Sequence, residues 1–270
     1  MQTNALSPNG RRLASALRNG AVQLWTVSRG QKSPILERDL RPPASSAAQP
    51  LLTWAASGDY LAARLDNVYV WNGTTGELVG TLSFPSQPDP IALSPDGRLL
   101  AVGLVPEGSR AFGQMSSGTR PFNSRIELWD VASGTRISGW DAHKEWISDL
   151  AFSPDGQVLA SANVDNTAKL WHVPTGTLKA NLLGHTLGVF GVAFSSDSRT
   201  LATAGRDALK LWNVETSLEL MTLERPGGDR VLFSEKDLAL VFQGDVGFTI
   251  RRAPSFAEIE AAEAARAKDR

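Results

Sequence analysis

The sequence has no cysteine, almost no net charge and no long apolar segment. The absence of cysteine from its 270 residues excludes disulfide bonds, thiolate zinc sites, iron–sulfur clusters and cysteine nucleophiles. The 27 Lys and Arg nearly balance the 28 Asp and Glu, so the broad positive field that attracts nucleic acids or anionic membranes is missing. No run of about 18 apolar residues occurs, and the first residues lack the apolar centre of a signal peptide. We therefore expect a cytoplasmic protein that binds neither nucleic acid nor membrane.

Short motifs of the common ligand-binding enzymes are also missing. The patterns H-E-x-x-H, G-x-x-x-x-G-K-[ST] and G-x-G-x-x-G do not occur, and these are typical of zinc, nucleoside triphosphate and dinucleotide sites, respectively. We expect no metal, no cofactor and no catalytic residue.

Five of the eight tryptophans recur in nearly the same local sequence. They are separated by 46, 58, 42 and 41 residues, and each is followed five residues later by Gly or Ser. A period of this length indicates repeated supersecondary units. The five are Trp25, Trp71, Trp129, Trp171 and Trp212.

A turn sequence precedes most of these tryptophans. It reads SPNG from Ser7, SPDG from Ser94 and Ser153, and SSDS from Ser195. Proline presets the first turn dihedral and glycine accepts a positive φ, so these are turns between strands, and Asp96 and Asp155 are interpreted as turn residues. The flanking segments alternate apolar and polar residues, which is typical of strands. Each unit therefore reads as four strands.

The repeated Trp, turn and Gly/Ser pattern resembles the WD-repeat β-propeller family, and its final Arg-Ala-Pro-Ser phrase is similar to that of bacterial-type members. The resemblance implies an all-β fold: a β-propeller of about six four-stranded blades over residues 1–253, the last blade degenerate with Arg251 at the tryptophan position, and a short C-terminal α-helix over 254–270. A closed ring of six blades and the C-terminal portion of a longer propeller both stay open. The expected units lie near 1–40, 51–84, 90–140, 146–183, 188–224 and 229–253.

Two units carry the complete polar set that the family uses inside a blade. By resemblance, an aspartate, a histidine, a Ser or Thr and the tryptophan form a hydrogen-bonded string with a structural role. The alternative, a serine-hydrolase triad, is disfavoured because the set occurs twice and no nucleophile elbow is present. The two sets are His143, Ser161, Asp165 and Trp171, and His185, Thr203, Asp207 and Trp212.

Two insertions interrupt the repeat. The third unit carries 17 extra residues within Leu104–Ser124, and the segment Arg41–Pro50 separates the first unit from the second. Both enlarge loops of the types that the histidine–aspartate pairing brings to one face of the disc. They are either tolerated surface insertions or a lip that binds a partner.

Candidate partner-binding residues lie on that same face, where exposed aromatic and arginine side chains suit an interface. The alternative for Trp146 and Phe190 is packing between blades, which we also assign to Trp54 and Trp140. His172 is expected to face solvent. The candidates are Trp146, Ser148, Phe190, Arg206, Arg18, Arg110, Phe112 and Arg120.

The sequence thus predicts a non-catalytic scaffold that binds a protein or peptide. The alternative is a propeller enzyme or small-ligand binder that uses the central channel. Neither the partner nor the pathway follows from the sequence.

Overall fold

The computed structural model describes residues 3–17, 19–28, 33–42, 50–84, 88–104, 123–224, 228–234, 240–244 and 247–251. All regular structure in these ranges is β, and no helix occurs in them, which confirms the all-β prediction. The helix expected over 254–270 lies outside the described residues. None of the described segments is a helix long and apolar enough to span a bilayer.

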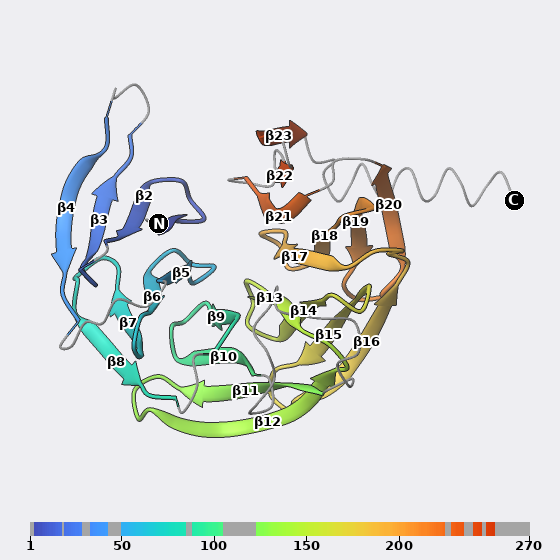
Figure 1. The fold of residues 1–270 in the computed structure, drawn as a ribbon, viewed down its shortest axis with the longest axis horizontal. Coiled ribbons are helices and arrows are strands. Elements are labelled where there is room, and N and C mark those ends of the chain that lie inside the picture. The colour runs from blue at the N-terminus through green and yellow to red at the C-terminus, as the bar shows by residue number, and fades with distance from the viewer. Residues whose placement is uncertain are drawn as a thin grey trace, which may run out of the picture. The chain divides into compact units, whose positions relative to one another are not determined.

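The described strands form antiparallel sheets in which neighbours along the chain pair with each other (Figure 1). The first three sheets have four strands each. Their bounds are β1 (Thr3–Leu6), β2 (Arg12–Ala16), β3 (Val22–Thr26) and β4 (Ile35–Leu40); β5 (Leu51–Trp54), β6 (Tyr60–Arg64), β7 (Val68–Asn72) and β8 (Leu78–Leu82); β9 (Ile91–Leu93), β10 (Leu99–Leu104), β11 (Ser124–Asp130) and β12 (Thr135–His143).

Two further four-stranded sheets and one three-stranded sheet follow. The described residues form two compact units, one that ends at Ala142 and one that begins at His143. One propeller over 1–253 stays a prediction. The strands of the second unit are β13 (Ile147–Phe152), β14 (Val158–Asn163), β15 (Thr167–His172) and β16 (Thr177–Leu183); β17 (Val189–Phe194), β18 (Thr200–Gly205), β19 (Ala208–Asn213) and β20 (Glu219–Glu224); β21 (Gly228–Phe233), β22 (Leu240–Gly244) and β23 (Gly247–Arg251).

The turn between the first two strands has the same hydrogen bonds in four sheets. In the SPDG turn, the Ser94 hydroxyl donates to Asp96 Oδ1 at 2.6 Å and accepts the Leu99 N–H at 2.8 Å. Asp96 also accepts the Arg98 N–H, so the interpretation of Asp96 as a turn residue is confirmed. The same pattern recurs at Ser7 with Asn9, Ser153 with Asp155, and Ser195 with Asp197.

Each sheet carries one cross-strand row of mostly large apolar residues at the position of the repeated tryptophan, which Arg251 takes in the sixth sheet. We call it the tryptophan row. Cross-strand partners lie on one face of a sheet, so each row is a continuous ridge. In the first, second, fourth and fifth sheets the rows are Leu6–Leu13–Trp25–Leu36, Trp54–Leu61–Trp71–Leu78, Phe152–Leu159–Trp171–Leu178 and Phe194–Leu201–Trp212–Glu219.

The opposite face of each sheet carries a row of smaller residues, which we call the alanine row. It reads Ala5–Ala14–Leu24 in the first sheet, Thr53–Ala62–Val70 in the second, Ala151–Ala160–Leu170 in the fourth and Ala193–Ala202–Leu211 in the fifth. Alternation of side chains along a strand places the two rows on opposite faces.

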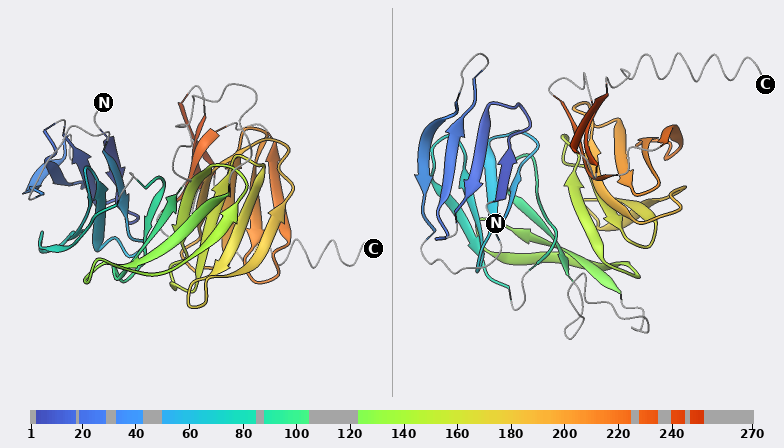
Figure 2. Two further views of the ribbon diagram at one scale, coloured as in Figure 1. Left: turned by 60° about the horizontal axis from the view of Figure 1, so that its bottom comes forward. Right: turned by 45° about the horizontal axis from the view of Figure 1, so that its top comes forward.

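The sheets inside each unit pack by a tryptophan row on the alanine row of the preceding sheet. Ala14 and Leu24 pack with Leu61 and Trp71 in one buried cluster, and the second sheet covers the third in the same way. In the second unit the fourth sheet covers the fifth and the fifth covers the sixth, and Figure 2 shows these sheets facing one another. The core of each unit therefore lies between its sheets.

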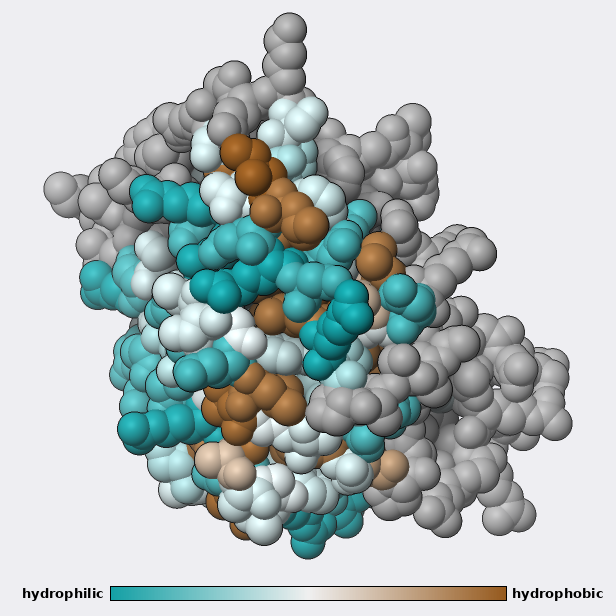
Figure 3. All heavy atoms as spheres, turned by 90° about the vertical axis from the view of Figure 1, so that its left-hand side faces the viewer, coloured by the Kyte–Doolittle hydropathy of each residue, from teal (hydrophilic) through white to brown (hydrophobic). Residues whose placement is uncertain are grey.

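The outer strands expose several large apolar side chains. Figure 3, with β4 toward the viewer, shows separate apolar patches among hydrophilic residues. On β4 and β8 the exposed apolar residues are Ile35, Leu36, Leu78 and Val79.

Candidate functional site

The fourth sheet brings its predicted polar set together. His143 ends β12, although we expected it in a loop, and it is 3% exposed. Its Nε2 lies 2.7 Å from Ser161 Oγ, which also accepts the Trp171 Nε1–H at 2.9 Å. Its Nδ1 lies 3.4 Å from Asp165 Oδ2. The four side chains form one string from the end of β14 to the sheet centre.

The fifth sheet contains the same string with shorter contacts at the aspartate. His185 Nδ1 lies 2.7 Å from Asp207 Oδ1, and its Nε2 lies 2.7 Å from Thr203 Oγ1, which accepts the Trp212 Nε1–H at 2.9 Å. Asp207 also accepts the Thr186 N–H at 2.7 Å and the Thr186 hydroxyl at 3.1 Å. Asp207 therefore fixes the loop that enters this sheet as well as its histidine.

Protonation equilibria follow from these contacts. Burial lowers the pKa of His143 and outweighs the hydrogen bond and charge of Asp165. Burial opposes ionisation of Asp207, but the Thr186 N–H and His185 hold its pKa down at about 2. Burial likewise opposes ionisation of Asp165, whose pKa is lowered by hydrogen bonds from His143 and Thr167. Both carboxyl groups are therefore ionised at neutral pH.

The order Asp165, His143, Ser161 resembles that of a hydrolase triad, but the serine has no access to a substrate. Ser161 is fully buried, and its oxygen is bonded to two ring nitrogens. Thr203 holds the same place in the fifth sheet. The arrangement satisfies buried polar groups and presents no nucleophile.

The described partner-binding candidates lie at one end of the fourth and fifth sheets, in loops and in the first residues of β13 and β17. Phe190 is the extra residue of a β-bulge in β17, between Val189 and Gly191, and a bulge redirects a side chain. The Arg206 guanidinium lies over the half-buried Phe190 ring, 4.8 Å from its centroid. Arg206 itself is exposed. The two candidates thus form one cation–π pair.

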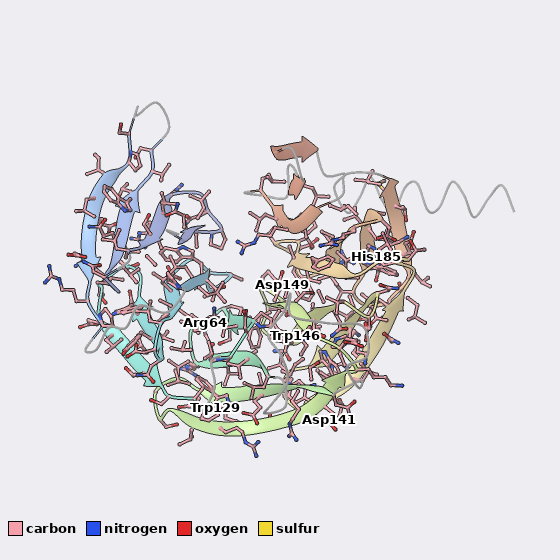
Figure 4. The ribbon with its side chains drawn as sticks, viewed as in Figure 1. Arg64, Trp129, Asp141, Trp146, Asp149 and His185 are labelled. Atoms are coloured by element: carbon pink, nitrogen blue, oxygen red, sulfur yellow. The ribbon has the colours of Figure 1, made fainter. Side chains whose placement is uncertain are left out.

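Trp146 and Ser148 lie at the equivalent end of β13, and both are half-buried. Figure 4 labels Trp146 and Asp149 beside β13 and His185 nearer the outer strands. The Ser148 hydroxyl donates to the Val189 carbonyl at 2.5 Å, and Asp149 Oδ2 accepts the Val192 N–H at 3.0 Å. These bonds tie β13 to β17, so Ser148 already has an acceptor inside the unit.

Four candidates, Arg18, Arg110, Phe112 and Arg120, lie outside the described residues, as does most of each insertion. Trp54 and Trp140 lie on strands, and His172 is exposed, as expected. Within the described part of the chain, no three His, Asp or Glu residues gather as a metal site.

The sequence reasoning missed Leu187. It lies in the loop between β16 and β17 and is 50% exposed, three residues before Phe190. An isolated leucine between Thr186 and Gly188 in a polar loop was the available signal.

A family model for the WD40 repeat, "WD domain, G-beta repeat", matches residues 134–172 and 176–213. Each match begins near the outer strand of one sheet and ends on the tryptophan strand of the next. The polar strings described above fall within these two matches.

Three curated relatives match longer segments. Apoptotic protease-activating factor 1 of Danio rerio is 28% identical over 171 residues, 60% of this chain and 12% of its own length. WD repeat-containing protein 91 homolog of Dictyostelium discoideum is 27% identical over 194 residues, 58% of this chain and 24% of its own. Nuclear distribution protein PAC1-2 of Uncinocarpus reesii is 31% identical over 172 residues, 60% of this chain and 35% of its own.

The chain therefore spans between 12% and 35% of the lengths of these relatives. All three come from eukaryotes, so they do not support the bacterial-type resemblance inferred from the C-terminal phrase. The two matched WD40 repeats and the relatives with WD repeats together support a WD-repeat family for this chain.

Proposed function

We propose that the chain is a non-catalytic WD-repeat scaffold. It binds a protein or peptide partner through the loop end of the fourth and fifth sheets. The observation that carries this proposal is the exposed Arg206 held over Phe190, with the exposed Leu187 in the adjacent loop. Arginine and aromatic residues with apolar neighbours are the usual anchors of protein interfaces.

The position of the pair in the sheet supports an interface. Successive antiparallel strands reverse direction, so the loop before β17 and the loop between β18 and β19 lie at the same end of the fifth sheet. The first holds Leu187 and the second holds Arg206. The Arg206 N–H donates to the Gly188 carbonyl at 3.3 Å, which joins the two loops. A rigid sheet therefore presents a charged group and an apolar group side by side.

The absence of catalysis is part of this proposal. Both polar strings are buried and serve the sheets, and their duplication fits a scaffold element better than a single reaction centre. The WD-repeat family generally binds protein partners, which supports the same conclusion. We place the protein in the cytoplasm for lack of an apolar segment in the sequence.

The test compares two ends of one sheet. Arg206→Ala and Phe190→Ala together should weaken capture of a partner by about 30-fold, or about 2 kcal/mol. The matched control is Arg199→Ala, because Arg199 is an exposed arginine in the loop between β17 and β18, at the opposite end of the same sheet.

Affinities come from titrating a partner recovered by pull-down against each purified variant, with thermal melts to verify the fold. Loss of binding in Arg199→Ala with retention in the double variant would place the partner at the other end of the sheet. Equal affinity of the parent protein, the double variant and Arg199→Ala would show that Phe190 and Arg206 do not contribute to the interface.

A further inference from the structure

The guanidinium of Arg206 is oriented by its surroundings while its hydrogen-bond donors stay unused. Its Cζ lies 4.8 Å from the centroid of the Phe190 ring, and the Arg206 N–H donates to the Gly188 carbonyl. The side chain is exposed, and within the described part of the chain no group accepts a hydrogen bond from the guanidinium or forms an ion pair with it. A guanidinium that is already oriented loses little side-chain freedom when it pairs with an anion.

The aspartates at this end of the fourth and fifth sheets are engaged inside the unit. Asp207 is bonded to His185 and Thr186, and Asp165 belongs to the polar string of the fourth sheet. Their side chains are only 15% and 21% exposed. Arg206 therefore presents a positive charge at the surface of a chain whose net charge is −1, and the complementary group on a partner is an anion.

The charge of Asp207 favours a carboxylate over a phosphate as this anion. Asp207 follows Arg206 directly in the sequence, and it is ionised at neutral pH because its hydrogen bonds hold its pKa down at about 2. A phosphate group carries nearly two negative charges at neutral pH, so Asp207 would repel it more strongly than it repels a carboxylate. The side chains of Asp and Glu on a partner fit Arg206 best.

The apolar neighbour of Arg206 is Leu187, which is 50% exposed. Its loop is fixed from two sides. The side-chain amide of Asn166, from the fourth sheet, donates to the Thr186 carbonyl at 3.3 Å, and Asp207 accepts the Thr186 N–H and hydroxyl. A ligand that uses both groups must carry a carboxylate and an apolar group close together, as nearby residues of a peptide do.

We propose that this end of the fifth sheet binds an acidic peptide segment, in which an Asp or Glu side chain pairs with Arg206 and a nearby apolar residue packs on Leu187. The inference rests on the proposed function and adds the chemistry of the partner. Two parallel hydrogen bonds from the guanidinium fix the orientation of a carboxylate, and the contact with Leu187 buries apolar surface beside them.

The first experiment selects short peptides from a random displayed library on the purified full chain. Peptides that bind the parent protein but not Arg206→Gln should contain Asp or Glu at least about threefold more often than the unselected library, with an apolar residue nearby. The matched control is Arg199→Gln, which changes an exposed arginine at the opposite end of the same sheet. This control should recover the same peptides as the parent protein.

The second experiment compares one selected peptide with a copy in which every Asp and Glu is replaced by Asn and Gln. Fluorescence anisotropy of the labelled peptides gives both affinities. Arg206→Gln should weaken the acidic peptide about tenfold and the amide copy at most about twofold, and Arg206→Lys should restore only part of the loss because lysine lacks the bidentate geometry. Leu187→Ser should weaken both peptides by a similar factor.

Two further measurements use the parent protein alone, so they need no variant to fold. Raising the salt concentration from about 0.05 M to about 0.5 M should weaken the acidic peptide several-fold and leave the amide copy nearly unchanged. A peptide with phosphoserine in place of the key Asp or Glu should bind more weakly than the acidic peptide. Tighter binding of the phosphopeptide would overturn the assignment of a carboxylate.

The remaining outcomes separate this inference from the proposed function. A selection that yields basic or uncharged peptides, or no peptide at all, would overturn the inference, as would equal losses of the acidic peptide and its amide copy in Arg206→Gln. If the partner recovered by pull-down still depends on Phe190 and Arg206, the proposed function stands and only the chemistry assigned to the partner is wrong. If neither that partner nor the peptides respond to these substitutions, both are wrong.

Discussion

The second and fifth sheets bury equivalent tryptophans, Trp71 and Trp212, with different neighbouring side chains. In the fifth sheet, Trp212 donates to Thr203, and a histidine and an aspartate extend the string. In the second sheet, Tyr69 stacks on Trp71 with centroids 5.7 Å apart and planes at 27°. The Tyr69 hydroxyl donates to Asp66 Oδ1 at 3.1 Å.

The two sheets differ at one cross-strand pair between their second and third strands. Thr203 lies opposite Lys210, whereas Ala63 lies opposite Tyr69. Without a hydroxyl on the second strand, a tyrosine from the third strand fills the space and reaches the aspartate itself. The position of the aspartate is retained, since Asp66 precedes its tryptophan by five residues, as Asp207 does. The aspartate therefore organises the loop in both sheets, and what links it to the tryptophan can change.

The largest expected effect is on stability, which should fall more when the polar string of the fifth sheet is broken than when the tyrosine hydroxyl of the second sheet is removed. Thr203→Val keeps the shape of the side chain but leaves two buried ring nitrogens without their partner, so the free energy of unfolding should fall by about 2–4 kcal/mol. Tyr69→Phe removes one hydroxyl from a half-buried carboxylate and should cost about 1 kcal/mol. Chemical denaturation of both variants measures the difference. Equal decreases in the free energy of unfolding would mean that the Thr203 hydroxyl stabilises its sheet no more than the Tyr69 hydroxyl does.

A smaller difference is expected between the two strings. Asp207→Ala should lower the free energy of unfolding by about 1–3 kcal/mol because His185 and Thr186 lose their acceptor. Asp165→Ala should cost less, since its oxygen lies 3.4 Å from His143 Nδ1 against 2.7 Å for Asp207 and His185. Melting both variants beside the parent tests the order, and parental melting of both would contradict the structural role of the strings.

The smallest expected effect is a dependence of stability on pH. Because the folded pKa of His143 is lowered, its contribution is complete above the unfolded value and is lost as the pH falls below about 6.5. Asp207 and Asp165 contribute above their unfolded values, and this contribution is lost as the pH falls further, for Asp207 toward about 2. Melting temperature should therefore decrease between about pH 7 and about pH 5.5 and again below about pH 4. His143→Gln should flatten the first decrease only.

The local sequence was sufficient to predict the strands and the strings. Pro-Asp-Gly turns, alternating residues and the spacing of the tryptophans can be read along the chain, and they predicted the antiparallel strands that the described residues form. The spacing of His185 to Trp212 likewise identified groups that hydrogen-bond.

Contacts between separate loops and sheets could not be predicted in the same way. The burial of Phe190 depends on a bulge and on Arg206 from another loop, and the acceptor of Ser148 belongs to a different sheet. The role of Tyr69 depends on Ala63 opposite it, and register between strands is not visible in a pattern along one strand.

The direction in which the rows pack matters while the chain is being synthesised. Inside each unit, the sheet that supplies the alanine row precedes the sheet that supplies the tryptophan row, and the strands that pair in the described sheets are consecutive in the chain. A sheet can therefore close from local contacts as its residues leave the ribosome. When the next sheet of the same unit emerges, the alanine row that will bury its tryptophan row has therefore already formed.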